Sequence, residues 1–83
     1  KLLKNQESVF LTSTELSLLD VLIKTPRTPL SRDQLAKHGG VYLTQRTVDV
    51  QITRLRRKIE PQPRFPIYIR TIRHQGYAFW PDE

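Results

Sequence analysis

The chain has 83 residues, no cysteine and a formal net charge of +6, which limits it to one small domain without disulfides or thiolate chemistry. It has no apolar run near the roughly 20 residues that a membrane-spanning helix needs and no signal-peptide pattern. The basic excess lies in residues 46–73, with eight basic and two acidic side chains, and favours a polyanionic partner such as nucleic acid or an anionic membrane, although it also fits a surface that is merely soluble.

The first eleven residues, KLLKNQESVFL, predict a short hairpin in which apolar residues flank a polar turn at residues 5–7. The following segment, LTSTELSLLDVLIKTP, predicts a helix that ends near Lys24, because Pro26 cannot continue it. Thr12 and Glu15 have the spacing of a capping box, in which each side chain binds the other residue's backbone N–H. The expected apolar face of this helix consists of Leu16, Leu19, Val21, Leu22 and Ile23.

The segment PLSRDQLAKHGG predicts a second, shorter helix. Ser31 is its expected N-cap and Gln34 is the partner in a capping box. Leu35 and Ala36 can face the core. Glycines 39 and 40 end the helix, and a loop with the sequence VYLTQ follows.

Residues 46–60, RTVDVQITRLRRKIE, predict the third helix, which ends before a proline-rich turn. At about 100° per residue, one side of it is a core-facing stripe made of Val48, Ile52, Leu55 and Ile59. The opposite side is basic and consists of Arg46, Val50, Arg54 and Arg57, flanked by Thr47, Gln51, Thr53 and Lys58. A solvated helix surface usually mixes charges of both signs, but the acids here, Asp49 and Glu60, lie on a flank near Arg56.

Val50 is an apolar residue on this basic side. A single exposed valine is ordinary, but apolar groups in the DNA major groove also pack on thymine methyls. Arg54 beside it could bind guanine through its forked guanidinium, and Gln51 could bind adenine or a phosphate. Arg46, at the start of the helix, is better placed for a backbone phosphate.

Residues 67–72, IYIRTI, predict a strand, RHQG predicts a turn and YAFW predicts a returning strand. Arg70 and Arg73 lie on this second hairpin, with His74 and Gln75 at its tip. A hairpin that carries arginine beside a recognition helix can enter the neighbouring minor groove, where arginine is favoured if the groove is narrow. The three helices and the hairpin together predict an α+β winged helix-turn-helix fold with an N-terminal hairpin remnant and a C-terminal wing.

From Leu11 to Trp80 the sequence resembles the C-terminal effector domains of OmpR/PhoB-type response regulators. Four segments carry the resemblance: LTSTELSLLDVL, PLSRDQL, RTVDVQITRLRRKIEP and YIRTIRHQGYAF. It implies a bacterial, cytoplasmic regulator of transcription of two-component type, with residues 46–60 in the major groove and the wing, residues 67–80, in the minor groove. The base contacts that it implies are Val50, Gln51, Arg54 and Arg73. The backbone contacts that it implies are Arg46, Thr47, Thr53, Arg56, Arg57, Thr71 and Tyr77.

The resemblance also implies that residues 1–83 form one DNA-binding domain without a receiver domain and with a truncated N-terminal sheet. The chain begins with Lys1 rather than Met, which indicates a piece of a longer protein. Implied partners are double-stranded DNA with direct repeats, a second copy bound head to tail, and RNA polymerase through the loop at residues 36–45, which is short for the family. The wing turn has His74 where the family usually has glycine. Because a residue with a side chain resists positive φ, we expect this turn to differ in shape.

Other chemistry has little support in the sequence. His38 and His74 lack the spacing of zinc ligands, and no serine lies in a motif that would activate it. We therefore expect no enzyme activity, no cofactor and no membrane partner. One alternative is a winged-helix interaction module that docks an acidic protein, although such a module has no use for Val50 beside Arg54. RNA binding is another, but the exposed aromatic pairs that stack unpaired bases are missing.

Overall fold

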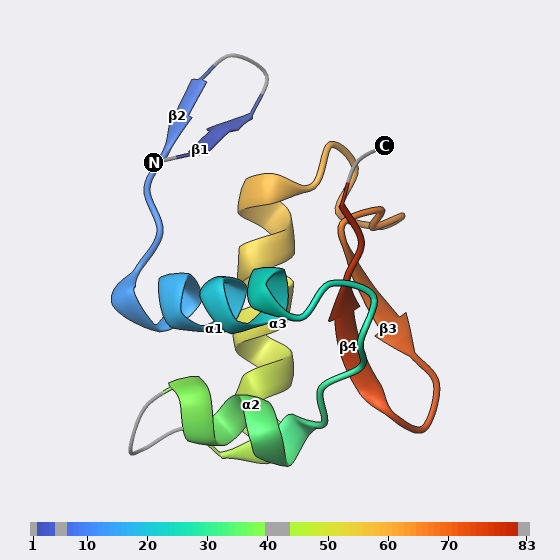
Figure 1. Ribbon diagram of the computed structural model, residues 1–83. Helices are drawn as coiled ribbons and strands as arrows, with labels where there is room; N and C mark the ends of the chain where they lie inside the picture. The colour runs from blue at the N-terminus through green and yellow to red at the C-terminus, as the bar shows by residue number, and fades with distance from the viewer. Residues whose placement is uncertain (1, 5–6, 40–43, 82–83) are drawn as a thin grey trace.

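The computed structural model describes residues 2–4, 7–39 and 44–81. The elements along the chain are β1 (Leu2–Lys4), β2 (Glu7–Val9), α1 (Ser13–Lys24), α2 (Arg32–Gly39), α3 (Gln45–Ile59), β3 (Ile69–Ile72) and β4 (Gly76–Phe79). β1 pairs with β2, and β3 pairs with β4, in two separate antiparallel hairpins. Figure 1 shows α3 behind α1 and α2, with the β3–β4 hairpin, the wing, beside it. This arrangement confirms the predicted α+β winged-helix fold. Residues 5 and 6 of the first turn and residues 40–43 of the predicted loop lie outside the described residues.

Each helix starts at a reciprocal capping box. In α1, Thr12 Oγ1 accepts a hydrogen bond from the Glu15 N–H at 3.1 Å, and the Glu15 carboxylate accepts one from the Thr12 N–H at 2.8 Å. Ser31 and Gln34 form the same pair of bonds at the start of α2, so both predicted boxes are confirmed. The box of α3, between Thr44 and Thr47, was not predicted. It starts the helix one residue before the expected boundary, at Gln45, and the helix ends at Ile59.

The three helices and the wing bury one apolar core, made of Leu18, Leu19, Leu22, Leu30, Leu35, Ala36, Val48, Ile52, Leu55, Ile69 and Tyr77. The predicted stripe of α3 is confirmed, with Ile59 partly buried at its end. The predicted face of α1 is wrong at Leu16 and Ile23, which are 56% and 45% exposed, and it omits Leu18, which is fully buried. Leu18, Leu19 and Leu22 are spaced so that they share one side of the helix, whereas Leu16 and Ile23 share another.

The wing is attached to the rest of the domain along the outer edge of β4. Leu30, before α2, exchanges two backbone hydrogen bonds with Tyr77, at 2.8 and 3.0 Å, and the Arg27 N–H donates to the Phe79 carbonyl at 2.8 Å. Gly76 permits this close approach, because a Cβ atom there would lie 1.9 Å from the Leu30 carbonyl oxygen. The edge of β4 is therefore paired rather than open.

The first wing strand is shorter than predicted, because β3 begins at Ile69 rather than Ile67. The second has the predicted length but lies one residue earlier, over residues 76–79 rather than 77–80. His74 in the turn has a φ of 67°. This residue therefore adopts the left-handed conformation that its side chain disfavours, at a cost of roughly 1–2 kcal/mol. Among the described residues, every helix is too short or too polar to cross a bilayer.

Candidate nucleic-acid interface

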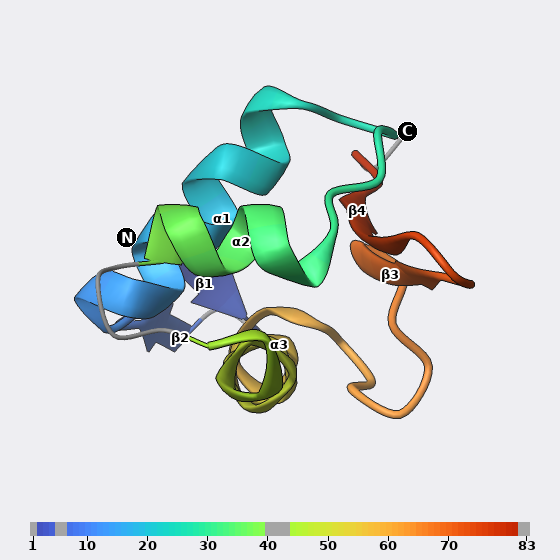
Figure 2. The ribbon, with the colours of Figure 1, turned by 90° about the horizontal axis from the view of Figure 1, so that it is seen from below.

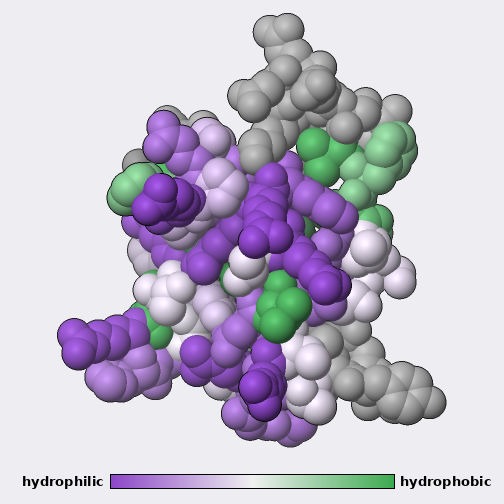
Figure 3. All heavy atoms as spheres, turned by 180° about the vertical axis from the view of Figure 1, so that it is seen from behind, coloured by the Kyte–Doolittle hydropathy of each residue, from purple (hydrophilic) through white to green (hydrophobic). Residues whose placement is uncertain are grey.

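The side of α3 that faces away from α1 and α2 is exposed and basic. Arg46 and Arg54 are exposed on it, and Val50 is 45% exposed between them. Neither guanidinium has a hydrogen-bond or ionic partner within the described residues. Figure 3, which views the molecule from the side opposite to Figure 1, shows a largely hydrophilic surface with small apolar areas. Cations without an internal partner are available to an external anion.

The wing supplies a second exposed group of polar side chains. Arg73, His74 and Gln75 are exposed at its turn, and the Arg73 guanidinium has no partner in the part of the chain that the structure describes. Figure 2 shows the wing projecting beside α3, which is seen nearly end-on. A polar hollow separates the wing turn from the starts of α2 and α3, and Arg32, Gln45, Thr71 and His74 are among its lining residues. The helix and the wing turn can thus meet one ligand together.

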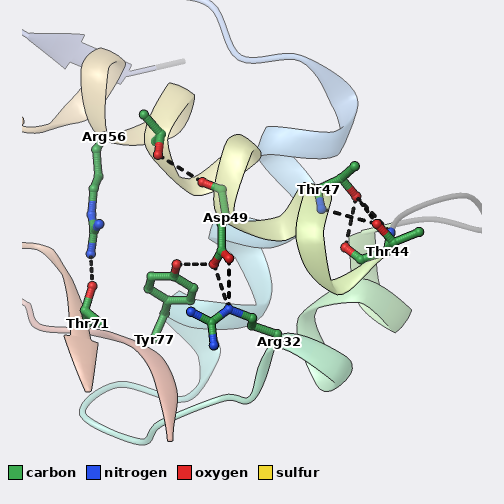
Figure 4. Close-up of polar contacts among 8 residues, drawn as sticks. Arg32, Thr44, Thr47, Asp49, Arg56, Thr71 and Tyr77 are labelled. Atoms are coloured by element: carbon green, nitrogen blue, oxygen red, sulfur yellow. Dashed lines mark hydrogen bonds and ion pairs between the residues drawn. The ribbon is translucent and has the colours of Figure 1, made fainter. Parts of the chain in front are cut away.

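Asp49 is an acid on α3 whose charge is compensated within the domain. Arg32 Nε donates to its two carboxylate oxygens at 2.8 and 3.0 Å, and the Tyr77 hydroxyl donates to Oδ1 (Figure 4). Burial favours a higher pKa for Asp49, but these hydrogen bonds and the charge of Arg32 hold the pKa below its ordinary value. Burial and the neighbouring carboxylate raise the pKa of Tyr77. The Tyr77 hydroxyl is therefore protonated at neutral pH, and its proton is committed to Asp49.

Arg56 joins α3 to the wing. Its Nε and Nη2 donate to the Ile69 carbonyl oxygen at 3.0 and 2.7 Å. Nη2 also donates to Thr71 Oγ1 at 2.9 Å, as Figure 4 shows. Burial lowers the pKa of Arg56, and the nearby Tyr77 and Glu60 oppose that effect. Arg56 is thus a cation whose donors are largely occupied inside the domain.

The structure divides the predicted DNA contacts into two groups. Residues exposed on α3 or at the wing turn are Arg46, Val50, Arg54, Arg57 and Arg73, with Gln51 half-buried beside them. Residues whose polar groups bind within the domain are Thr47, Thr53, Arg56, Thr71 and Tyr77. Contacts of the second group with a phosphate stay predictions. The hydroxyls of Thr47, Thr53 and Tyr77 would have to change their acceptors, whereas Thr71 accepts from Arg56, which donates through Nε and Nη2.

Sequence reasoning missed three residues near this surface. Lys58, predicted to flank the basic side, instead binds Glu15 at 2.6 Å and the Phe10 carbonyl at 3.2 Å. Arg32 was not predicted to be near α3, and Glu60 was not predicted to be buried. The contacts of Lys58 and Arg32 join parts of the chain that are 43 and 17 positions apart, so no local pattern could have indicated them. Glu60 is bonded seven to nine positions further along the chain, across the proline-rich turn, whose path the sequence did not indicate.

The fold and this surface agree with comparisons to known proteins. A family model described as "Transcriptional regulatory protein, C terminal" matches residues 5–79. Protein PetR of Rhodobacter capsulatus is 39% identical over 90 residues, which cover 99% of this chain and 38% of PetR. The chain thus spans little more than a third of the length of that relative.

Two solved structures are similar in fold and in sequence. The DNA-binding domain of RstA from Klebsiella pneumoniae, solved in complex with the RstA box, is 35% identical with a TM-score of 0.76, over 89% of this chain and 76% of that one. DrrB, an OmpR/PhoB homologue from Thermotoga maritima, is 31% identical with a TM-score of 0.80, over 88% of this chain and 34% of that one. The chain therefore belongs to the family of C-terminal domains of transcriptional regulatory proteins, the winged-helix DNA-binding domains of OmpR/PhoB-type response regulators.

Proposed function

We propose that this domain binds duplex DNA with sequence specificity and regulates transcription as the output domain of a two-component regulator. In this proposal α3 lies in the major groove and the wing turn lies in the adjacent minor groove. Basic side chains on phosphates supply most of the affinity, and contacts with base edges supply the specificity.

The observation that carries the proposal is the pair of Val50 and Arg54 on the outward side of α3. These residues are four positions apart, so they are neighbours one turn apart on the helix surface. Val50 is 45% exposed, and Arg54 has no partner within the described residues. A thymine methyl suits the valine, and guanine O6 and N7 suit the forked donors of the arginine. A surface that served only to attract an acidic protein would gain nothing from the exposed valine.

The remaining contacts have different degrees of support. Arg73 at the wing turn is suited to a narrow minor groove, where the potential is most negative. Gln51 is proposed to reach a base, and Arg46 and Arg57 to bind phosphates from the same side of α3. Thr47, Thr53 and Tyr77 would bind phosphates only after their hydroxyls exchange an internal acceptor for a phosphate oxygen. Thr71 is proposed to donate its hydroxyl proton to a phosphate while its oxygen accepts from Arg56.

The full-length protein is proposed to act in the bacterial cytoplasm, under the control of a receiver domain. Two copies are proposed to bind direct repeats head to tail, and RNA polymerase is proposed to contact the segment that includes residues 36–45. These points rest on the family to which the chain belongs and on the greater length of PetR.

Two substitutions on α3 test base reading against phosphate binding. Arg54→Ala should weaken binding by ~1–3 kcal/mol and relax specificity at one base pair. Arg46→Ala should weaken binding to every duplex about equally and lower the slope of log affinity against log salt by ~0.9. Both are measured by titration of duplexes with single base changes at several salt concentrations.

Arg64→Ala is the matched control, because Arg64 is exposed in the segment between α3 and β3 and its loss changes the net charge equally. An equal loss on all duplexes for Arg54→Ala would contradict base reading. Equal effects of Arg64→Ala and Arg46→Ala would show that only net charge matters.

A further inference from the structure

The outer edge of β3 is covered by two side chains, one from the last turn of α3 and one from its C-cap residue. At Ile69, the first residue of the strand, the N–H donates to Glu60 Oε2 at 2.8 Å, and the carbonyl accepts the two bonds from Arg56. Both main-chain groups of one strand residue are thus held by residues four positions apart in the chain, at the last turn of α3 and its C-cap. These groups lie on the edge that β4 does not pair, where they would otherwise lack partners in a buried position.

Glu60 is wholly buried, which is unusual for a carboxylate unless it is fully bonded. It follows the last turn of α3 in an extended conformation. Its two oxygens also accept from the Ile67 N–H at 2.8 Å and from the Tyr68 N–H at 3.1 and 3.2 Å. Three consecutive backbone N–H groups therefore bind one carboxylate, which fixes the segment that leads into the wing.

Arg56 extends this attachment to both wing strands. It binds Ile69 and Thr71 on β3, and its Cζ lies 5.4 Å from the centroid of the Tyr77 ring on β4. The planar guanidinium makes several directed bonds at once, which the single ammonium of lysine cannot reproduce.

We propose that Arg56 and Glu60 are positioning residues that fix the wing relative to α3, so that minor-groove recognition by Arg73 depends on them. A two-stranded hairpin is marginally stable by itself, so the orientation of this one is set by its attachments. On β4 these attachments include the backbone bonds of Leu30 and Arg27 and the bond from the Tyr77 hydroxyl to Asp49 of α3. On the edge of β3 the main chain is held by Arg56 and Glu60. Arg73 is four residues beyond Ile69 on the same hairpin. A displacement of the β3 backbone at Ile69 therefore also displaces Arg73. The proposal rests on the proposed function, and it gives Arg56 a role through the wing rather than on a phosphate.

The test compares two duplexes selected by the domain that differ only in the segment under the wing, one A·T-rich and the other G·C-rich. The readout is the ratio of the two affinities for the parent domain and for Arg73→Ala, Arg56→Lys and Glu60→Gln. Arg56→Lys keeps the charge and removes the fork, and Glu60→Gln places an amide donor among backbone donors. Both should lower the ratio toward that of Arg73→Ala, while discrimination at the base pair read by Arg54 stays unchanged. Combined with Arg73→Ala, neither should lower the ratio further.

Glu15→Gln is the matched control, because Glu15 is another buried, hydrogen-bonded glutamate that has no contact with the wing. All variants are compared at temperatures where thermal unfolding shows them folded, and Arg56→Lys carries the test if Glu60→Gln does not fold. The proposal is overturned if Arg56→Lys keeps the parent ratio, or if Glu60→Gln changes the ratio no more than Glu15→Gln does. A parent domain that ignores the wing segment and the loss of Arg73 would instead overturn the proposed minor-groove contact, and the positioning role with it.

Discussion

At the scale of single residues, Glu15 shows how a buried acid holds two helices together. It is 1% exposed, and it accepts hydrogen bonds from the Thr12 N–H at 2.8 Å and from Lys58 Nζ at 2.6 Å. Burial alone would raise the pKa of Glu15. The hydrogen bonds from Lys58 and Thr12, with the charge of Lys58, outweigh burial and hold the pKa below the ordinary value of 4.5. The start of α1 is thus joined to α3 through an ionised carboxylate.

This lowered pKa predicts how stability depends on pH. The folded state binds the proton of Glu15 less readily than the unfolded state does, so the stability that it contributes is present above about pH 4.5 and is lost as the pH falls through the folded-state pKa. Asp49 also has a lowered pKa and contributes in the same direction. Urea unfolding between pH 7 and pH 3 should show this loss. Glu15→Gln should be less stable at pH 7 and should lose less on acidification, and a profile parallel to that of the parent would contradict the assignment.

At the scale of elements, α1 and α3 differ in how well the sequence determines their buried faces. In α3 polar or charged residues separate the apolar ones, so the stripe of Val48, Ile52 and Leu55 follows from spacing alone. In α1 six of the eight residues from Leu16 to Ile23 are apolar, and spacing cannot select among the possible faces. The packing of α1 against α2, α3 and β4 selects Leu18, Leu19 and Leu22.

Two substitutions in α1 measure that selection. Leu18→Ala should lower the free energy of unfolding by ~2–5 kcal/mol, because it leaves a cavity in the core. Leu16→Ala removes the same atoms from an exposed position and should change stability by less than about 0.5 kcal/mol. Denaturant unfolding of both variants makes the comparison. Equal losses would mean that the buried face of α1 is assigned wrongly.

The contrast between local patterns and contacts of distant residues explains how much of the surface could be predicted. The basic side of α3 and the capping boxes of α1 and α2 follow from residues within one or two helical turns, and the sequence indicated them. The contacts of Arg32 with Asp49, of Lys58 with Glu15, and of Arg56 with Ile69 join residues that are 17, 43 and 13 positions apart. The local sequence pattern is the same for a polar side chain that is bonded within the domain and for one that is exposed to a ligand. For this reason the predicted contacts include residues that bind within the domain.

At the scale of the whole molecule, one core supports two exposed elements that can meet adjacent grooves of a duplex. The wing is bonded to Leu30 on one edge and to α3 on the other, so the turn that carries Arg73 has a fixed relation to the recognition helix. In the proposed function, such a body would bind one half-site in one orientation. Two copies bound head to tail would then require half-sites that repeat in the same direction, about one helical turn apart.

The most direct measurement is selection of random DNA duplexes by the purified domain at two salt concentrations. Specific recognition predicts enrichment of a direct repeat with half-sites ~10–11 bp apart, with the same sequence enriched at both concentrations as overall affinity falls. Binding that enriches no sequence and disappears as salt rises would contradict sequence-specific recognition. It would leave a basic surface suited to an acidic protein partner.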